Sequence, residues 1–179
     1  MGIGKVKAVF LDRDGVLNEA IVRDGKPYPP RTLEEFRIVE DAPEALRKLK
    51  DAGYLLIVVT NQPDIARGTA SRDTMEAFDA ALRAALPIDD IFSCFHDDSD
   101  HCDCRKPKPG LLLAAAQKHN IDLESSYMIG DRWRDIDAGA AAGCRTILID
   151  HRYAERPPDH HAWARVESVS EAAELVVAD

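Results

Sequence analysis

The sequence predicts an α/β fold in which helices cover both faces of a doubly wound parallel sheet. Five short stretches rich in Val, Ile and Leu are continuously apolar rather than alternating, which is typical of strands that are buried on both faces. They lie at 6–12, 55–61, 90–97, 127–131 and 146–150. Segments with helical periodicity separate them, and this alternation of strand and helix indicates a doubly wound sheet.

Each predicted helix has a recognisable start or end. Asp41 can cap the first helix, and Ser71 can cap the second, since each precedes apolar residues spaced three or four apart. Pro109 suits the first turn of the third helix. A fourth helix follows Asp135 and ends at Gly143.

Two segments, 21–36 and 151–170, lack this periodicity and are rich in turn-forming and charged residues. We expect surface connections there, the second leading into a final helical turn or two, and either segment could line the mouth of a substrate site. The chain contains no internal repeat and no convincing linker. We therefore expect one domain over residues 1–179.

The composition argues against some classes of partner. The sequence has 32 acidic and 23 basic residues and a formal net charge of -9, which disfavours binding to nucleic acid or to an anionic membrane. No apolar run approaches the roughly 20 residues of a membrane span, and the amino-terminal stretch lacks the features of a signal peptide. We expect a cytoplasmic monomer that acts on a small molecule.

Polar side chains follow several of the predicted strands. Asp12 and Asp14 come after the first strand, Thr60 and Asn61 end the second, and Asp131 ends the fourth. Ligands of open α/β sheets bind at the carboxyl ends of the strands. Each residue alone could be a cap or a turn residue, but their recurrence at successive strand ends indicates one polar site.

The residue types at these positions indicate phosphoryl transfer. Asp12 and Asp14 are two residues apart on an extended segment and so point to the same side. With Asp131 they suit Mg²⁺, which takes carboxylates together with phosphate oxygens. Asp12 suits the nucleophile that would form an aspartyl-phosphate, and Asp14 the general acid and base. Donors for the charge of the transferring group could come from Thr60, the loop amides near Asn61, and Lys106.

A second set of metal-ligand residues lies in "CFHDDSDHCDC", residues 94–104. The set provides the three sulfurs and one nitrogen of tetrahedral structural zinc: Cys94, His96, Cys102 and Cys104. His101 could compete with His96, and buried thiols without metal are the alternative. Zinc here would fix the path of the loop that delivers Arg105 and Lys106. Cys144 stands apart and is expected to be a small buried residue.

"DRDGVLN", "TNQ", "RKPKPG" and "GDRWRDID" resemble, in order and rough spacing, the four motifs of haloacid dehalogenase-like phosphatases over residues 7–150. The resemblance implies the roles given above, with the backbone carbonyl of Asp14 as a magnesium ligand and Asp135 as a residue that orients its neighbours. Only one predicted helix fits between the first two motifs. We therefore expect no cap domain and a small, exposed phosphate ester as the substrate.

The zinc loop with "CRKPKPG" resembles the branch of that family that contains phosphatases of heptose bisphosphate and of histidinol phosphate. "FLDRDGVLN", "VVTNQPDIARG" and "SYMIGD" are more similar to the heptose enzymes. This implies hydrolysis of the 7-phosphate of D-glycero-D-manno-heptose 1,7-bisphosphate, with histidinol phosphate as the second candidate substrate. Phe95 and Arg132 replace a usual proline and a frequent lysine, which leaves the exact sugar open.

The resemblance also implies that Arg105 recognises the substrate, and we expect further substrate contacts from Asn61, Gln62 and Arg132. Two hypotheses from other classes are a phosphoacceptor signalling domain and a zinc-stabilised binding module without turnover. Asp14 argues against the first, because it can drive leaving-group protonation and hydrolysis. The intact set of acids argues against the second.

Overall fold

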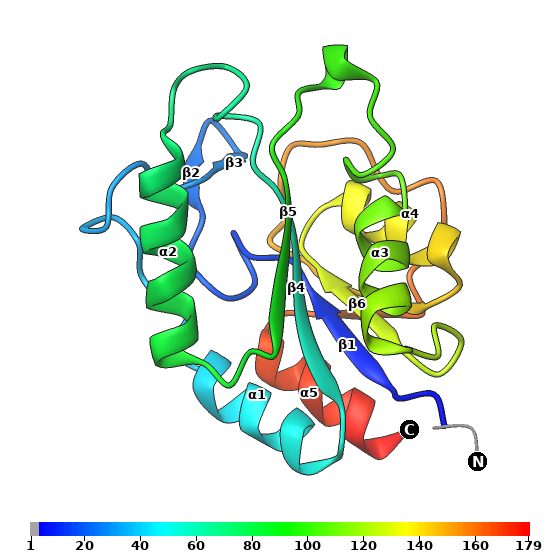
Figure 1. The fold of residues 1–179 in the computed structure, drawn as a ribbon. Helices are drawn as coiled ribbons and strands as arrows, with labels where there is room; N and C mark the ends of the chain where they lie inside the picture. Colours follow the sequence, from blue (N-terminus) through cyan, green and yellow to red (C-terminus); the bar gives the residue numbers. More distant parts are fainter. Residues whose placement is uncertain (1–3) are drawn as a thin grey trace.

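The computed structural model describes residues 4–179 and contains the predicted parallel sheet (Figure 1). Six strands lie in the order β5-β4-β1-β6-β7-β8, and every neighbouring pair is parallel. Their bounds are β1 Ala8–Leu11, β4 Leu55–Asn61, β5 Asp90–Cys94, β6 Tyr127–Gly130, β7 Arg145–Ile149 and β8 Ala164–Val166. The chain runs from β1 outward to β5 and then returns to β6 on the other side of β1. This reversal creates a crevice at the carboxyl ends of β1 and β6.

Helices cover both faces of the sheet, and their bounds are α1 Ala42–Asp51, α2 Arg72–Ala85, α3 Gly110–His119, α4 Trp133–Ala142 and α5 Val169–Ala178. Alternate side chains of β1 enter two separate cores. Val9 and Leu11 pack in the core that contains residues of α1, α2 and α5, whereas Ala8 and Phe10 pack in the core that contains residues of α3 and α4.

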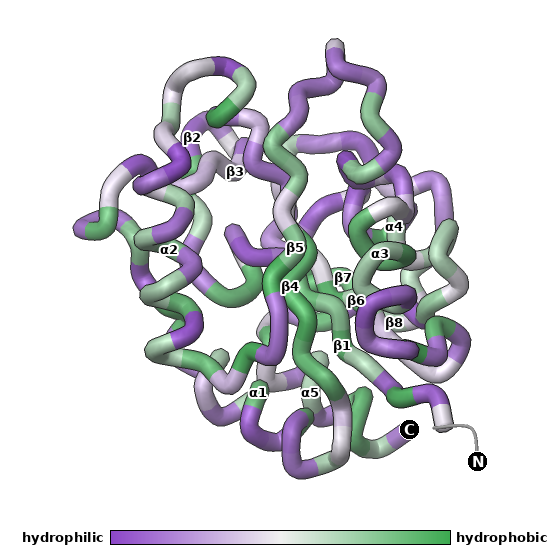
Figure 2. The backbone as a smooth tube through the Cα atoms, in the orientation of Figure 1, coloured by the Kyte–Doolittle hydropathy of each residue, from purple (hydrophilic) through white to green (hydrophobic). Residues whose placement is uncertain are grey.

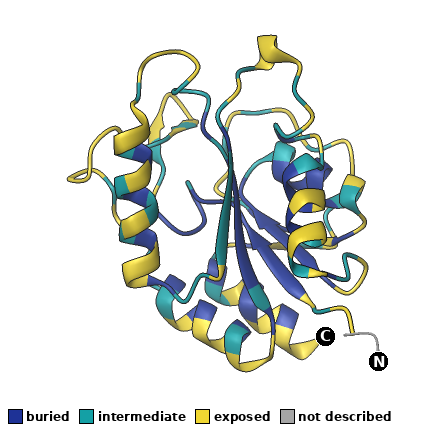
Figure 3. Ribbon diagram, in the orientation of Figure 1, coloured by how far each residue is buried: buried dark blue, intermediate teal, exposed yellow. Residues whose placement is uncertain are grey.

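The sheet is therefore apolar on both faces, and the strands are the most hydrophobic part of the tube in Figure 2. Figure 3 shows that the central strands β1, β4 and β6 are largely buried while the outer faces of the helices are exposed. The continuous hydrophobicity that predicted buried strands is confirmed, because each face of the sheet has its own layer of helices. No helix in the described part of the chain is long and apolar enough to span a bilayer.

The interval between β1 and α1 holds a short antiparallel hairpin, β2 Ile21–Arg23 and β3 Lys26–Tyr28, where the sequence predicted a loop. Within the described residues no cap domain follows β1, as expected. Three-residue strands are too short to give a period-2 pattern, and Gly25 at the turn has φ +73. The pattern of local hydrophobicity could not reveal this hairpin.

The segment 151–170 was predicted to be a surface connection, and that prediction is wrong at its end. Ala164–Val166 forms β8 beside β7, and Val169 begins the ten-residue helix α5. The error arose because β8 has only three residues and its pairing depends on a distant strand.

Two predicted helix starts need correction. Asp41 precedes α1, but its side chain makes no cap to that helix and accepts a hydrogen bond from Ser170 N, in the first turn of α5, at 3.0 Å. The fourth helix begins at Trp133 rather than after Asp135, so Asp135 lies in the first turn of α4. Ser71 caps α2 as predicted, since its hydroxyl accepts a hydrogen bond from Thr74 N at 3.1 Å.

Candidate active site

The carboxyl ends of the three central strands bring together the predicted polar residues. Asp12 follows β1, Thr60 lies near the end of β4 and Asp131 follows β6, and all three side chains are buried. Lys106 reaches them from the loop before α3. Its ammonium donates to Asp12 Oδ1 at 2.8 Å, to Asp135 Oδ1 at 2.6 Å and to the carbonyl oxygen of Val59 at 2.7 Å.

Lys106 is 2% exposed, so its charge depends on these partners. Burial lowers the pKa of the ammonium, but Asp12 and Asp135 outweigh burial and raise that pKa above its usual value. Asn61 fixes the backbone at the same point: its amide nitrogen donates to the Lys106 carbonyl and its amide oxygen accepts from Lys106 N, both at 3.0 Å. The charged lysine is therefore held from both its backbone and its side chain.

Asp12, Asp131 and Asp135 place one carboxylate oxygen each within 4.8 Å of one another. Burial, followed by the charge of Asp135, raises the pKa of Asp12 to about 6, although Lys106 opposes the shift. Burial and Asp12 raise the pKa of Asp131 as well. Three acids beside one lysine leave unbalanced negative charge, which a divalent cation would neutralise.

The hydrogen bonds of these acids indicate where a cation would fit. Both oxygens of Asp131 are buried; the hydroxyl of Tyr153 lies against this carboxylate, but neither oxygen receives a hydrogen bond of full geometry from the described residues. By contrast, Asp135 uses Oδ1 for Lys106 and Oδ2 for Arg132 N at 3.1 Å. Asp131 and Asp12 therefore have ligand atoms to offer, while Asp135 orients its neighbours. Carboxylate oxygens of this kind suit Mg²⁺.

Two glycines make this crowding possible. Gly15 has φ +88, and a Cβ there would lie 1.9 Å from Asp131 Oδ2. A Cβ on Gly130 would lie 2.1 Å from Asp135 Cβ. The turn after the first motif and the end of β6 can therefore approach the acids only because neither position carries a side chain.

The carboxylate of Asp14 lies outside the cluster of Asp12, Asp131 and Asp135; the metal contact that the resemblance implies for Asp14 belongs to its backbone carbonyl and stays a prediction. The carboxylate instead accepts hydrogen bonds from Arg13 Nη2 at 3.1 Å, Asn18 Nδ2 at 3.0 Å and Gln62 Nε2 at 2.9 Å. Arg13 is 1% exposed and lies over the rings of Phe36 and Phe78. Asp14 is thus oriented separately from Asp12, although only one residue separates them.

Asn61 and Gln62 were predicted to contact substrate, and their side chains are engaged within the protein. Gln62 is buried, and its amide nitrogen donates to Asp14 Oδ2 and to Thr60 Oγ1 at 2.8 Å. Asn61 lines the cavity described below, but both ends of its amide bind the backbone of Lys106. Both residues therefore position catalytic candidates, which the sequence pattern could not distinguish from substrate binding.

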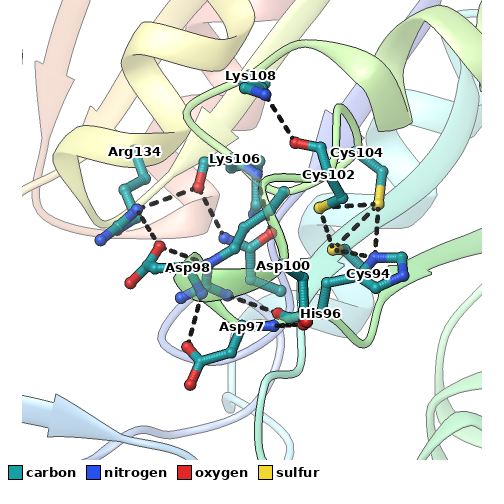
Figure 4. Close-up of polar contacts among 12 residues, drawn as sticks. Cys94, His96, Asp97, Asp98, Asp100, Cys102, Cys104, Lys106, Lys108 and Arg134 are labelled. Carbon is teal, nitrogen blue, oxygen red and sulfur yellow. Dashed lines mark hydrogen bonds and ion pairs between the residues drawn. The ribbon is translucent and has the colours of Figure 1, made fainter. Parts of the chain in front are cut away.

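The predicted zinc ligands converge at the end of β5 (Figure 4). The Sγ atoms of Cys94, Cys102 and Cys104 lie 3.1–3.7 Å apart, and His96 Nδ1 lies 3.6 Å from Cys94 Sγ and 3.3 Å from Cys104 Sγ. Zn–S bonds of about 2.3 Å in a tetrahedron place sulfurs about 3.8 Å apart, so this donor set fits Zn²⁺. Among the described residues His96, not His101, completes the set.

The cationic residues next to this cluster have acidic partners. Arg105 Nε donates to Asp98 Oδ1 at 2.8 Å, and Arg134 Nη1 lies 3.4 Å from the same oxygen and 3.4 Å from the Lys106 carbonyl. Arg132 forms a two-point ion pair with Glu155. Sequence reasoning missed Arg134 and Glu155, because neither follows a predicted strand directly.

A cavity of about 510 Å³ opens above Asp12 and Asp14. Its wall includes the predicted residues Asn61, Lys106, Arg105 and Arg132. The β2–β3 hairpin contributes Arg23, Lys26 and Tyr28, and the segment after β7 contributes Glu155. The segments 21–36 and 151–170, which the sequence indicated as candidate linings of a substrate site, therefore both contribute residues to the mouth of this cavity.

A parallel sheet with acids and a buried lysine at its carboxyl edge has the arrangement of an enzyme active site at a topological switch point. The chain belongs to the haloacid dehalogenase-like hydrolase family, whose sequence model matches residues 30–143. The matched part contains Thr60, Lys106 and Asp131, and β1 with Asp12 precedes it.

Individual relatives narrow the comparison. The D-glycero-beta-D-manno-heptose-1,7-bisphosphate 7-phosphatase of Pasteurella multocida is 41% identical over 155 residues, which cover 80% of this chain and 81% of that protein. The D-glycero-alpha-D-manno-heptose-1,7-bisphosphate 7-phosphatase of Photorhabdus laumondii is 36% identical over 171 residues, covering 88% and 90%. A crystal structure of D,D-heptose 1,7-bisphosphate phosphatase from B. bronchiseptica, complexed with magnesium and phosphate, has a TM-score of 0.81 at 29% identity and covers 96% of this chain and 98% of that one.

Proposed function

We propose that this chain is a Mg²⁺-dependent phosphatase that hydrolyses the 7-phosphate of D-glycero-D-manno-heptose 1,7-bisphosphate through an aspartyl-phosphate. The observation that carries the proposal is the contact between Lys106 and Asp12 beside the buried carboxylate of Asp131, in a chain that resembles heptose bisphosphate phosphatases. The role of each side chain in phosphoryl transfer follows from the contacts that it makes in the site.

Asp12 acts as the nucleophile. Its Oδ1 accepts a hydrogen bond from Lys106, which holds the carboxylate in a fixed orientation. Lys106 opposes the effect of burial on the pKa of Asp12 and so favours the carboxylate form that attacks phosphorus. Mg²⁺ held by Asp12, Asp131 and the backbone carbonyl of Asp14 would neutralise charge on the phosphoryl oxygens.

Asp14 acts as the general acid and base. It donates a proton to the leaving alkoxide oxygen when the phosphorus–oxygen bond breaks, and it later takes a proton from the water that hydrolyses the aspartyl-phosphate. Gln62 holds its carboxylate beside Thr60. Because the Thr60 hydroxyl oxygen accepts a hydrogen bond from Gln62, its own proton is available for a phosphoryl oxygen.

Zn²⁺ held by Cys94, His96, Cys102 and Cys104 has a structural role. Four protein ligands leave no open position, so this metal would take no part in the chemistry. The cluster is followed directly by Arg105 and Lys106, and it fixes the loop that carries them. A catalytic group displaced by about 1 Å can lose about 100-fold in rate, so this loop needs such a clamp.

The substrate is tested by comparing kcat/KM for heptose 1,7-bisphosphate, heptose 1-phosphate and histidinol phosphate. We expect turnover of the bisphosphate to its 1-phosphate and no turnover of the 1-phosphate. A large preference for histidinol phosphate would replace the substrate and keep the chemistry. Relatives with alpha and beta names have similar identity to this chain, so both anomers belong in the assay.

The chemistry is tested with Asp12→Asn, which should abolish phosphate release and retain zinc. Normal turnover by that variant would refute the assignment of Asp12 as the nucleophile. An absence of turnover by the wild-type protein, with phosphate retained on Asp12, would favour a phosphoacceptor domain. Binding of phosphate esters with neither turnover nor phosphorylation would favour a binding module. The single domain, the monomeric state and the cytoplasmic location stay predictions from the sequence.

A further inference from the structure

The segment that follows β7 is tied to the active site at two points before it reaches the cavity. His151 Nε2 donates to the carbonyl oxygen of Gly15, in the turn directly after Asp14, at 2.8 Å. Ala154 N donates to the carbonyl oxygen of Gly25, at the tip of the β2–β3 hairpin, at 2.8 Å. These contacts join the segment to the catalytic turn and to the opposite wall of the cavity.

The same segment is also fastened to α4 beyond the cavity. Asp137 in α4 accepts hydrogen bonds from Asp159 N at 3.2 Å and from His160 N at 2.9 Å. The guanidinium of Arg156 lies 3.5 Å from the ring centroid of Trp133, the first residue of α4. Residues 151–160 are therefore held at both ends.

Glu155 lies between these anchors and lines the cavity. Its carboxylate accepts from Arg132 Nε at 3.0 Å and also from Arg132 Nη2. The Glu155 side chain is 17% exposed and that of Arg132 is 36% exposed. A two-point contact fixes the plane of the guanidinium, and Arg132 Nη1 has no partner among the described residues.

Arg132 is the N-cap residue of α4, where the helix dipole disfavours a positive charge. Without Glu155 the arginine would be repelled from this position and free to adopt several rotamers. The Glu155 carboxylate compensates the charge of Arg132 and restricts its rotamers. It leaves Nη1 of Arg132 available for the substrate.

We propose that Glu155 is a positioning residue for Arg132 and thereby determines which leaving groups the cavity accepts. The inference rests on the proposed phosphatase function and concerns the part of the substrate away from the reacting phosphate. The chemistry at Asp12 does not depend on Glu155, so the two can be separated by experiment. A small aryl phosphate needs the catalytic residues alone, whereas a sugar bisphosphate also needs the cavity wall.

The test is a double-mutant cycle of Glu155→Ala, Arg132→Ala and the double variant. We expect Glu155→Ala to raise KM for heptose bisphosphate about tenfold with kcat changed less than about threefold, because binding outside the reacting group is lost. Arg132→Ala should lose at least as much, and the double variant should equal Arg132→Ala. Hydrolysis of p-nitrophenyl phosphate by Glu155→Ala should change less than about twofold.

Glu155→Gln keeps one acceptor for Arg132 and should give a KM between those of the wild type and Glu155→Ala, which also covers the case in which the alanine variant folds poorly. Glu167→Ala is the matched control, because Glu167 pairs with Arg152 on the surface at 3.8 Å and both are at least 80% exposed. Additive losses in the double variant would overturn the inference. Equal losses for both substrates, or unchanged KM for the bisphosphate, would overturn it as well.

Failure of the substrate proposal has a different signature. In that case the wild-type protein hydrolyses p-nitrophenyl phosphate and leaves heptose bisphosphate intact. The same cycle is then measured on the best sugar phosphate from a panel, and it decides the role of Glu155 by the same criteria.

Discussion

Replacing Lys106 with methionine removes the ammonium that joins two acids and a strand carbonyl beneath the active site. The substitution keeps an unbranched chain of similar length, so the packed volume changes little. It leaves Asp12 Oδ1, Asp135 Oδ1 and the Val59 carbonyl oxygen without the donor that each has at 2.6–2.8 Å. Both carboxylates are buried, so water cannot replace the lysine freely.

The expected magnitude follows from this burial. Removing one partner of a buried ion pair costs about 3–5 kcal/mol, because the remaining charge stays desolvated and uncompensated. For a protein of this size each kcal/mol corresponds to about 2–4 °C, so the melting temperature should fall by roughly 6–20 °C. The rate of phosphate release should fall by about 100-fold to 1,000-fold, as when one donor to a transition-state charge is removed.

Stability is measured by urea unfolding in magnesium-free buffer, because bound Mg²⁺ would mask the loss of the lysine charge. Adding Asp135→Asn to Lys106→Met removes one of the two orphaned charges, so the double variant should lose at least about 1 kcal/mol less than the sum of the single variants. Lys48→Met is the control: Lys48 pairs with Glu44 at 3.4 Å on the exposed surface of α1, and its loss should cost less than about 1 kcal/mol. If Lys106→Met unfolds like Lys48→Met, or if the double variant is fully additive, the argument that Lys106 compensates a buried acidic cluster is wrong.

Three further predictions concern the metals and the surface charges. Asp131→Asn should raise the melting temperature of the magnesium-free protein, because it removes a buried negative charge beside Asp12 and Asp135, and it should abolish the stabilisation by Mg²⁺ in a thermal-shift assay; an undiminished Mg²⁺ effect would contradict this. Cys102→Ser should lose zinc and melt roughly 4–8 °C lower, as for a loss of about 2 kcal/mol, whereas Cys144→Ser, outside the cluster, should retain zinc; an equal metal content would refute the ligand set. Burial raises the pKa of Asp90, but hydrogen bonds from Lys118 and His119 outweigh it and lower that pKa to about 2. A carboxyl group whose pKa is lower in the folded state stabilises the fold at pH values above its unfolded-state pKa. Asp90→Asn should therefore be less stable than the wild type near pH 6, and the difference should shrink between about pH 4 and pH 2. A difference in stability that grows in acid would contradict this prediction.

Local pattern was sufficient to locate most of the residues that converge at the sheet edge. Continuous hydrophobicity identified the strands, and strand ends in a parallel sheet share one edge, so Asp12, Thr60 and Asp131 could be placed together without coordinates. The convergence of Cys94, His96, Cys102 and Cys104 was also predictable, because ligand types at close spacing can meet within a single loop. These features depend on residues that are near one another in the chain.

The roles within the site were harder to predict, because they depend on which partner occupies each hydrogen-bonding atom. Asn61 and Gln62 have the residue types of substrate ligands, but their amides bind Lys106 and Asp14. Asp41 has the residue type of a helix cap, but it binds the first turn of α5. No local pattern distinguishes an amide or a carboxylate that faces substrate from one that faces the protein.

The sequence by itself determined the order of the five longer strands and of the helices between them, the edge at which the site lies and the chemical types available there. Only the tertiary structure decided that Lys106 neutralises Asp12 and Asp135, that Asp131 is buried beside these two acids, and that Glu155 holds Arg132. The physical reason is the distance along the chain over which each kind of interaction acts. Periodicity and capping act over a few residues, whereas ion pairing and burial depend on the approach of side chains that are far apart in the chain, and that approach exists only after the sheet and its helices have packed.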